Sequence, residues 1–423
     1  MNASQSPIFR LDCKAQSYDW GKIGSSSKVA RFAASSPAFT VHEDRPYAEL
    51  WMGTHPSGPS TLHGSDVTLE SVLKANPHLL TQYFYDEYHG HLPFLFKVLS
   101  INKALSIQAH PDKELAKKLY RERPAIYKDD NHKPEMAIAL TEFEALCGFR
   151  PLNEISAALG AWPELSDLVG RDAVDTFQNA LKEANVDNQR QALKQLYTAV
   201  MTAEASTVKE RLDSLIHKLT SAGKEYRPQT IEELVLRIHS QFPGDVGVFS
   251  LFFLNYVVLQ PGQAIFLAAN EPHAYLSGDC VECMAASDNV VRAGLTPKFK
   301  DVEVLTQMLT YQAKSSADQL LNGVSCAPHS PHSLLYDPPI EEFSVILTKL
   351  DHDNDKESLQ GTEGPSVVIV TNGKGVIRSE KASEVPVEAG NVLFVGANVP
   401  FSIEAQGEGG VTIYTAFSVK PDN

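Results

Sequence analysis

Residues 259–273 read LQPGQAIFLAANEPH, and residues 387–401 read VEAGNVLFVGANVPF. At a constant offset of 128 residues the two stretches share Gly262 and Gly390, Phe266 and Phe394, Ala269 and Ala397, Asn270 and Asn398, and Pro272 and Pro400. Each copy has a turn glycine, an apolar strand and a second turn. The recurrence therefore predicts two related β units within one chain.

The two copies differ at one chemically important position. His273 closes the first copy, whereas Phe401 closes the second. A duplicated small antiparallel barrel of the cupin, or jelly-roll, type would produce such a repeat. We therefore expect the first barrel to hold a metal ion and the second barrel to be structural.

The residue pattern on either side of the repeat divides the chain into three domains. Residues 1–150 and 246–320 have the short apolar runs and frequent turn residues of β structure, and they form the expected catalytic metal-binding cupin domain. Residues 151–245 have helical periodicity and form an expected helical insert whose role is packing. Residues 321–423 form the expected C-terminal cupin-like domain without metal. The predicted fold class is mainly β with a helical insert, made of two cupin-type barrels plus an α-helical domain.

Several individual elements can be predicted within these domains. Residues 93–100 and 104–110 are predicted strands, and Pro111 is expected to open the helix that follows the second. In the insert, Thr207 and Thr230 each stand three residues before a glutamate, which predicts two helix starts. The Asn-Gly pair within residues 371–375 predicts a hairpin turn.

Charge and composition exclude several partner classes. The 423-residue chain carries a formal charge of −15, which disfavours nucleic acid and anionic membranes as partners. An anionic substrate would therefore need a local basic pocket. The five cysteines are too few for a disulfide framework, and the N-terminus lacks a signal-peptide pattern. We expect a cytoplasmic protein and a monomer.

Three polar segments could supply metal ligands. In the strand of residues 104–110, Ser106, Gln108 and His110 share one face because side chains alternate. Glu135 follows Asn131-His-Lys-Pro, and His273 ends the repeat strand. Two imidazoles, a carboxylate and an amide oxygen suit Zn²⁺, and they also permit Fe²⁺ or Mn²⁺.

Two other features lie near these segments in the sequence. Cys280 and Cys283 have the spacing of a zinc pair, but the chain has no second pair, so buried small hydrophobic residues are the better interpretation. Arg292 and Lys298 follow His273 closely. They could meet an anionic substrate or a developing enediolate, or they could be ordinary surface charges.

Longer strings of sequence resemble the type I phosphomannose isomerases. They are YAELWMGTHP at 47–56, LPFLFKVL at 92–99, LSIQAHP at 105–111, NHKPE at 131–135, EPHAYL at 271–276, GDCVECM at 278–284 and SDNVVRAGLTPK at 287–298. The resemblance runs through most of the chain and is weakest in the insert and in the last hundred residues. No position of these strings departs from the family pattern.

The resemblance implies a function and a set of site residues. It implies one Zn²⁺ held by Gln108, His110, Glu135 and His273, an essential Arg292, and a metal-free second barrel. It also implies that a sugar-phosphate pocket is lined by Lys97, Ser106, Lys133, Tyr275, Glu282 and Lys298. The implied reaction interconverts mannose 6-phosphate and fructose 6-phosphate through an enediol, feeding GDP-mannose synthesis.

The base that moves the proton between C1 and C2 is open among three residues. A lysine beside Zn²⁺ would have a lowered pKa, which makes Lys133 the first candidate, ahead of His132 and Glu282. For the phosphate, some combination of Lys97, Ser106 and Lys298 is expected.

Two other functions fit part of the pattern. Two histidines and a glutamate also permit an iron-dependent cupin dioxygenase, which would need O₂. A bicupin sugar-binding or storage protein without catalysis is the second alternative, although it would not need Lys and Arg beside an intact metal set.

Overall fold

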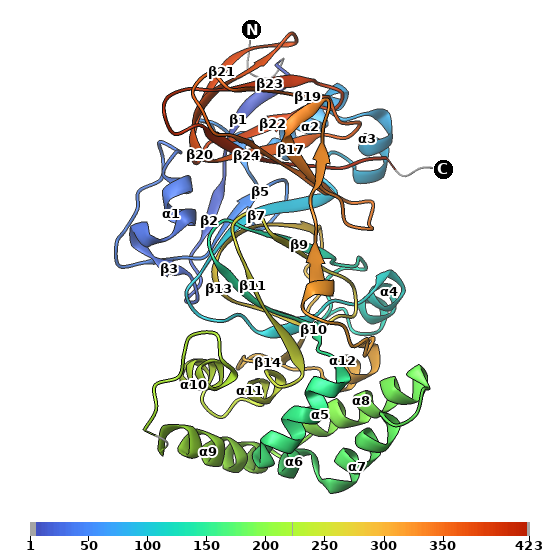
Figure 1. Cartoon of the computed structure of the whole chain (residues 1–423). Coiled ribbons are helices and arrows are strands. Elements are labelled where there is room, and N and C mark those ends of the chain that lie inside the picture. The colour runs from blue at the N-terminus through green and yellow to red at the C-terminus, as the bar shows by residue number, and fades with distance from the viewer. Residues whose placement is uncertain (1–5, 222, 421–423) are drawn as a thin grey trace.

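The computed structural model describes residues 6–221 and 223–420. Two β units and one helical unit are stacked along the long direction of the molecule (Figure 1), with the helices at one end and the C-terminal strands at the other. The fold class of a mainly β protein with a helical insert is confirmed. No helix in the described part of the chain has the length and apolar character needed to cross a bilayer.

The middle unit contains an 11-stranded antiparallel sheet. Its strands are β2 (Lys14–Gln16), β5 (Glu49–Met52), β7 (Phe94–Ile101), β8 (Ile107–Ala109), β9 (Glu135–Ala139), β10 (Phe143–Phe149), β11 (Leu254–Leu259), β12 (Ala264–Leu267), β13 (His273–Ala285), β14 (Val291–Gly294) and β15 (Leu320–Leu321). Strand β13 pairs with β8 and β10 through its first half and with β7 and β9 through its second half. It passes from one set of partners to the other near Gly278, which has φ +106°.

The C-terminal unit contains a second 11-stranded sheet. Its strands are β1 (Ile8–Asp12), β6 (Thr61–Leu62), β16 (Val324–Cys326), β17 (Ser330–Tyr336), β18 (Ser344–Leu350), β19 (Lys356–Leu359), β20 (Ser366–Ser379), β21 (Ala382–Glu388), β22 (Val392–Val395), β23 (Phe401–Ala405) and β24 (Val411–Phe417). Because β1 pairs with β22, the first strand of the chain belongs to the C-terminal sheet. The domain division expected from sequence stays a prediction, and this strand lies outside it.

The helical insert contains α5 (Leu152–Ala161), α6 (Pro163–Val169), α7 (Arg171–Ala180), α8 (Val186–Met201), α9 (Ala205–Ser221) and α10 (Ile231–Gln241). The other helices are α1 (Lys28–Ala33), α2 (Leu69–Ala75), α3 (Gln82–Tyr88), α4 (Lys113–Glu122), α11 (Gly247–Ser250) and α12 (Val302–Met308). Short 3₁₀ turns lie at η2 (Gly24–Ser26), η3 (Pro77–Leu79) and η4 (Ala317–Gln319), and β3 (Lys22–Ile23) pairs with β4 (Pro46–Tyr47).

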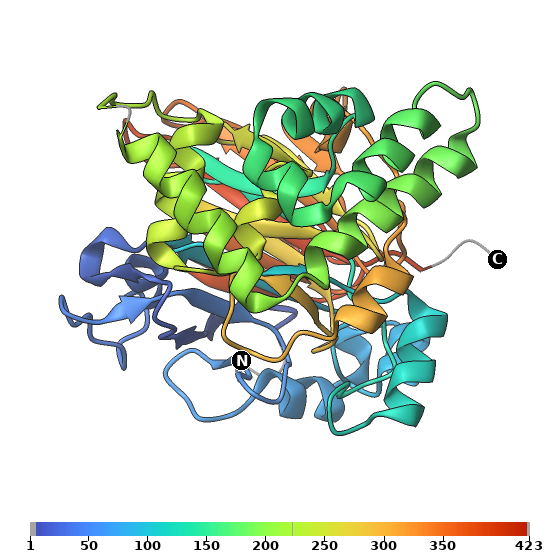
Figure 2. The same ribbon diagram turned by 90° about the horizontal axis from the view of Figure 1, so that it is seen from below.

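The insert covers the strands that carry the predicted site. Seen from below in Figure 2, its green and yellow-green helices lie over the strands of the middle unit. Alternate residues of three strands, Ile107 and Ala109 of β8, Ala274 and Leu276 of β13, and Val291 and Ala293 of β14, are buried in one apolar core with the insert helices. Since side chains alternate along a strand, the intervening residues of these strands face away from the insert.

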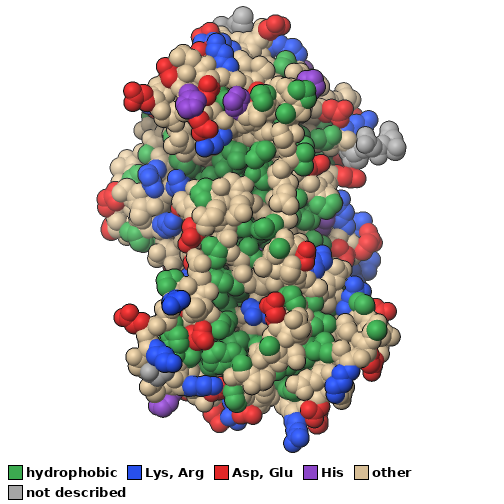
Figure 3. Space-filling model, viewed as in Figure 1, with side chains coloured by type: hydrophobic (Ala, Val, Ile, Leu, Met, Phe, Trp, Pro, Cys, Tyr) green, Lys and Arg blue, Asp and Glu red, His purple; other side chains and the backbone are tan. Residues whose placement is uncertain are grey.

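A second apolar core joins the two β units. It includes Phe96 and Ile138 of the middle sheet together with Ile369 and Phe394 of the C-terminal sheet. On the surface, Lys and Arg lie among Asp and Glu over the face shown in Figure 3. Acidic and basic side chains are therefore interspersed on this face.

The repeat found in the sequence is confirmed as a structural repeat. Gly262 and Gly390 have φ +87° and +96°, and Asn270 and Asn398 have φ +63° and +57°. In both copies the backbone N–H that follows the turn glycine donates to the carbonyl three residues earlier, at 2.9 Å. The strands β12 and β22 occupy matching places, and Phe401 lies in an apolar cluster of the C-terminal unit.

Some expected elements are wrong or incomplete. Residues 371–375 form no hairpin turn, because β20 runs through them with a register shift after Val370. Thr207 lies inside α9, whereas Thr230 is the N-cap of α10 as predicted. Asp112, not Pro111, caps α4, and the strand expected over 104–110 is regular only over 107–109. The strand pairing among the described residues leaves both sheets open, so closed barrels are not confirmed.

Candidate metal centre

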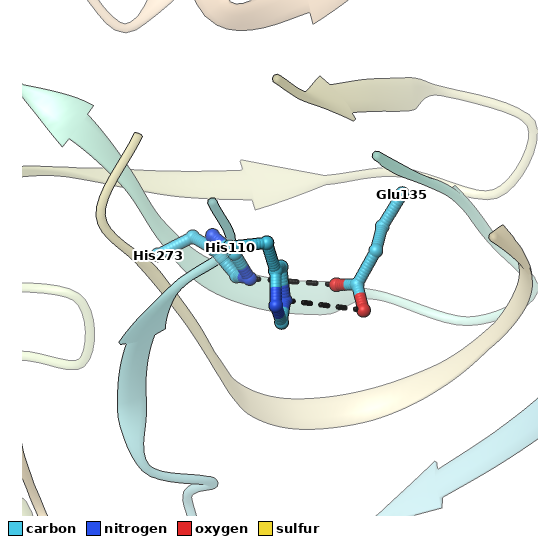
Figure 4. A group of neighbouring side chains, drawn as sticks. All are labelled: His110, Glu135 and His273. Atoms are coloured by element: carbon cyan, nitrogen blue, oxygen red, sulfur yellow. Dashed lines mark ion pairs between the residues drawn. The ribbon is translucent and has the colours of Figure 1, made fainter. Parts of the chain in front are cut away.

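Three buried side chains from three strands converge on one point. His110 directly follows β8, Glu135 opens β9 and His273 opens β13. Nε2 of His110 lies 3.3 Å from Oε1 of Glu135, and Nε2 of His273 lies 3.4 Å from Oε2. Figure 4 shows both rings directed at the same carboxylate. The three ligand atoms lie within 4.8 Å of one another, so one metal ion could be held between them.

The hydrogen bonds of the two rings fix which nitrogen can bind a metal. Nδ1–H of His110 donates to the carbonyl of Asn289 at 2.6 Å, and Nδ1–H of His273 donates to the carbonyl of Glu271 at 3.0 Å. Each Nε2 is then left with a lone pair. Both Nε2 atoms and Oε2 of Glu135 are buried without a hydrogen-bond partner among the described residues. Since unpaired buried acceptors are costly, a divalent cation between them fits this donor set.

The charge states of these groups favour the same conclusion. Burial lowers the pKa of His110 to about 4, with the nearby Glu135 carboxylate opposing the shift, so its ring is neutral at pH 7. Burial raises the pKa of Glu135, but the adjacent Lys133 ammonium is the largest opposing cause, and the pKa lies well below its usual range. A neutral imidazole and an ionised carboxylate are the forms that bind Zn²⁺.

Gln108 and Arg292 stand in one row with His273. Gln108 pairs with His273 across β8 and β13, and with Arg292 across β8 and β14. Directly opposed residues of antiparallel strands present their side chains on the same face. The amide of Gln108 accepts a hydrogen bond from Ser106 at 3.4 Å. Gln108 is therefore beside the three converging ligands, and its role as the fourth ligand stays a prediction.

Arg292 is half-buried and has no ion-pair partner among the described residues. Burial accordingly lowers the pKa of its guanidinium, and no carboxylate opposes that shift. It lines a cavity of about 220 Å³ together with Lys128 and two carboxylates, Asp288 and Asp301, of which Asp301 is paired with Arg123. An arginine without a counter-ion in a cavity suits an anionic ligand.

A buried ion-pair network lies on the face of the sheet that carries Glu135. Nζ of Lys97 is 3.1 Å from Oε2 of Glu282 and 3.6 Å from Oε2 of Glu49, and it lies over the ring of Trp51. Burial raises the pKa of Glu282, and the Glu135 and Glu49 carboxylates raise it further against the effect of Lys97. Glu282 is thus a carboxyl group with an increased affinity for protons.

The other predicted site residues lie at different places. Nζ of Lys133 is 3.2 Å from Oε1 of Glu135, so this lysine adjoins the metal ligands. Tyr275 is buried two residues after His273, and burial together with Glu282 and Glu135 raises the pKa of its hydroxyl. Lys298 is exposed just beyond β14. His132 is directed elsewhere, because its Nε2 contacts Glu342 at 2.5 Å.

The cysteine pair takes no part in the metal cluster. Cys280 and Cys283 are buried in two different apolar clusters, on opposite faces of β13. Burial raises the pKa of both thiols well above the usual value. The interpretation of these residues as small buried hydrophobic side chains is confirmed.

Glu49, Trp51 and Asn289 were not assigned a role from the sequence. Trp51 donates its Nε1–H to Glu49 at 2.5 Å, and Glu49 in turn contacts Lys97. Two signals were available, since Glu49 and Trp51 alternate on a strand within a family-like string, and Asn289 lies in another. Neither signal reveals which distant residue each side chain meets.

The sequence matches three family descriptions in order along the chain. Residues 8–152 match the catalytic domain of type I phosphomannose isomerase, residues 168–254 match the helical insertion domain of that family, and residues 333–379 match its C-terminal region.

Individual relatives match over nearly their full length. The mannose-6-phosphate isomerase of Schizosaccharomyces pombe is 46% identical over 97% of this chain and 99% of the relative. That of Aspergillus fumigatus is 47% identical over 97% of this chain and 96% of the relative. A Salmonella typhimurium mannose 6-phosphate isomerase, crystallised with fructose 6-phosphate and zinc, has a TM-score of 0.81 and 29% identity, covering 98% of this chain and all of that one.

Proposed function

The chain belongs to the type I phosphomannose isomerase family, and we infer that it interconverts mannose 6-phosphate and fructose 6-phosphate with one zinc ion. The observation that carries this conclusion is the convergence of His110, Glu135 and His273. The Nε2 atoms of both histidines and Oε2 of Glu135 are buried and lack hydrogen-bond partners among the described residues. The reaction moves a proton between C2 and C1 of the sugar, so the site must accept a proton and stabilise an enediolate. Zinc supplies Lewis-acid polarisation of the sugar oxygens when it is bound.

We propose Glu282 as the proton-transfer base, ahead of Lys133 and His132. Glu282 is buried and its pKa is raised, which makes its carboxylate a better proton acceptor near neutral pH. Lys133 is already paired with the Glu135 carboxylate, with its Nζ 3.2 Å from Oε1, and His132 is engaged by Glu342. Loss of C2 proton exchange with deuterated solvent in Glu282→Gln, measured by NMR, would support this assignment; exchange at the wild-type rate would refute it.

We propose that Arg292 stabilises the enediolate and that Lys298 and Ser106 bind the phosphate. The row His273–Gln108–Arg292 supports this role, because Arg292 shares a sheet face with His273 and is separated from it by one strand. A fixed donor on that face can stabilise the negative charge that develops in the reaction. Lys97 is less suited to phosphate than the sequence suggested, because two carboxylates already balance its charge. Lys298 is exposed in the segment that follows β14, where its ammonium is free to meet a phosphate from solvent.

Further proposals concern the setting of the enzyme. We propose a monomer in the cytoplasm that has neither nucleic acid nor membrane as a partner and whose product feeds GDP-mannose synthesis. The five cysteines are free thiols, which supports a reducing compartment, and the charge of −15 supports the expected lack of polyanionic partners. Light scattering of the purified chain would contradict the monomer if it gave twice the mass of one chain.

A direct assay tests the function. The purified holoenzyme is expected to convert mannose 6-phosphate to fructose 6-phosphate in the absence of O₂. Activity should disappear after dialysis against a chelator and return with added Zn²⁺. Metal-dependent O₂ consumption without isomerisation would indicate a dioxygenase instead, and sugar binding without turnover would indicate a binding protein.

A further inference from the structure

A carboxylate of the C-terminal unit lies between two segments of the middle unit. Glu342 belongs to the connection between β17 and β18 and is only 6% exposed. Its Oε1 accepts a hydrogen bond from Nε2–H of His132 at 2.5 Å and pairs with Nζ of Lys113 at 3.0 Å. One buried acid therefore bridges two segments that are far from it in sequence.

The C-terminal unit holds this carboxylate in place. Phe343, the next residue, is 1% exposed and lies in the apolar core shared by the two β units. The hydroxyl of Ser344 donates to Asp337 at 2.6 Å and closes the same connection. Burial raises the pKa of Glu342, but His132 and Lys113 together lower it to about 2, so the group is ionised at neutral pH.

Both bridged segments carry metal ligands. His132 stands three residues before Glu135, and Lys133 lies between them with its Nζ 3.2 Å from that carboxylate. Lys113 is the first residue of α4 and lies three residues after His110 in the chain. Glu342 thus contacts both the segment that follows His110 after β8 and the segment that leads to Glu135 at the start of β9.

The first of these segments is also fixed from its other side. The carbonyl of Asn131 accepts hydrogen bonds from Ser287 at 3.1 Å and Asn289 at 3.0 Å. Asn289 is the residue whose carbonyl orients His110. Residue 131 is therefore tied to the middle unit itself, while residue 132 is tied to the C-terminal unit through Glu342.

We propose that Glu342 is a positioning residue through which the C-terminal β unit fixes Lys133 and Glu135 in the active site. The inference rests on the isomerase function proposed above. Small displacements of reacting groups cost large factors in rate, and groups that support metal ligands typically change metal affinity or activity about 10- to 100-fold. The second β unit then contributes to catalysis although it has no metal ligand of its own in this arrangement.

The test compares Glu342→Gln with Glu341→Gln in the zinc-loaded enzyme. Glu341 is the adjacent, exposed carboxylate of the same connection and is a matched control. We expect kcat/KM of Glu342→Gln to fall about tenfold, chiefly through kcat, and zinc release to a coloured chelator to accelerate severalfold. The Glu341→Gln variant should match wild type in both measurements. Wild-type values for Glu342→Gln in both would overturn the proposal, whereas an inactive wild-type enzyme would overturn the function instead.

Two further variants separate positioning from a loss of folding. Glu342→Asp keeps the charge but is one methylene shorter, so it should lie between wild type and Glu342→Gln in kcat/KM and in zinc release. In a double-mutant cycle with His132→Gln, the two losses should overlap because both act through one contact. Fully multiplicative losses, or losses that follow the melting temperature alone, would refute a positioning role.

Discussion

The second ring nitrogen of each site histidine determines which nitrogen is free to bind a metal. The carbonyls of Asn289 and Glu271 take the Nδ1–H groups of His110 and His273, and this leaves both Nε2 lone pairs directed at Glu135. In the second copy of the repeat, Phe401 stands where His273 stands in the first. At this position the first unit therefore has a residue of the three-residue cluster, and the second unit has an apolar side chain.

Replacing Arg292 tests the account of charge stabilisation at this scale. Arg292→Ala is expected to lower kcat by about 10²- to 10³-fold because a fixed donor to the enediolate is lost. Zinc content, measured by atomic absorption, should stay at the wild-type value because Arg292 is no ligand. Arg190→Ala, at an exposed position of α8, is the control and should keep wild-type kcat. A kcat of Arg292→Ala within a factor of three of wild type would contradict the assignment.

Most of the metal cluster could be predicted from sequence, whereas the surroundings could not. Alternation along residues 104–110 predicted that Gln108 and His110 share a face, and the intervening Ile107 and Ala109 are indeed buried in the core with the insert, away from the cluster that holds His110. The partners of Lys97 and His132 were out of reach because they are long-range contacts. Glu282 and Glu342 are 185 and 210 residues away from them, and no local pattern encodes such pairings.

At the scale of single elements, two threonines offer a matched comparison. Thr230 caps α10 by accepting the N–H of Glu233, whereas Thr207 lies within α9. Thr230→Ala should therefore lower the free energy of unfolding by about 1 kcal/mol. Thr207→Ala should change it by only a few tenths of a kcal/mol, since alanine is a good helix former. Urea unfolding followed by circular dichroism measures both, and equal losses would contradict the boundaries of α9.

The connection between β17 and β18 gives a pH-dependent prediction. The pKa of Glu342 is lowered to about 2 from a usual value of 4.5, so its ion pairs stabilise the fold above pH 4.5. That contribution is lost as the pH falls from 4.5 toward 2. The stability difference between wild type and Glu342→Gln should therefore be largest near neutral pH and shrink below pH 4.5. Urea unfolding at a series of pH values checks this, and a difference that grows with acidification would contradict it.

The element that sequence predicted worst is β20. An Asn-Gly pair is the strongest short hairpin signal, and here Asn372 and Gly373 lie inside a 14-residue strand. Gly373 has φ +74° and follows a register shift against β24, so the pair forms an irregularity at which the strand changes partners. The local residues require a left-handed backbone in either case, and only the tertiary pairing decides between a turn and a bulge.

At the scale of the whole molecule, the three parts have separate tasks around one site. The insert packs against the apolar faces of β8, β13 and β14, so the opposite faces can carry Gln108, His273 and Arg292. The C-terminal unit shares a core with the middle unit and brings Glu342 to the site. The sequence predicted these parts but not the place of β1, because a five-residue strand gives no indication of its partner sheet.

Anomalous diffraction at the zinc edge, from crystals of the purified enzyme, tests the central claim most directly. One peak is expected per chain, with ligand distances of about 2.0–2.2 Å to Nε2 of His110, Nε2 of His273 and a carboxylate oxygen of Glu135. The amide oxygen of Gln108 should be the fourth protein ligand, and no peak should lie beside Phe401. A peak at Cys280 or Cys283, or none among the three converging side chains, would contradict the account.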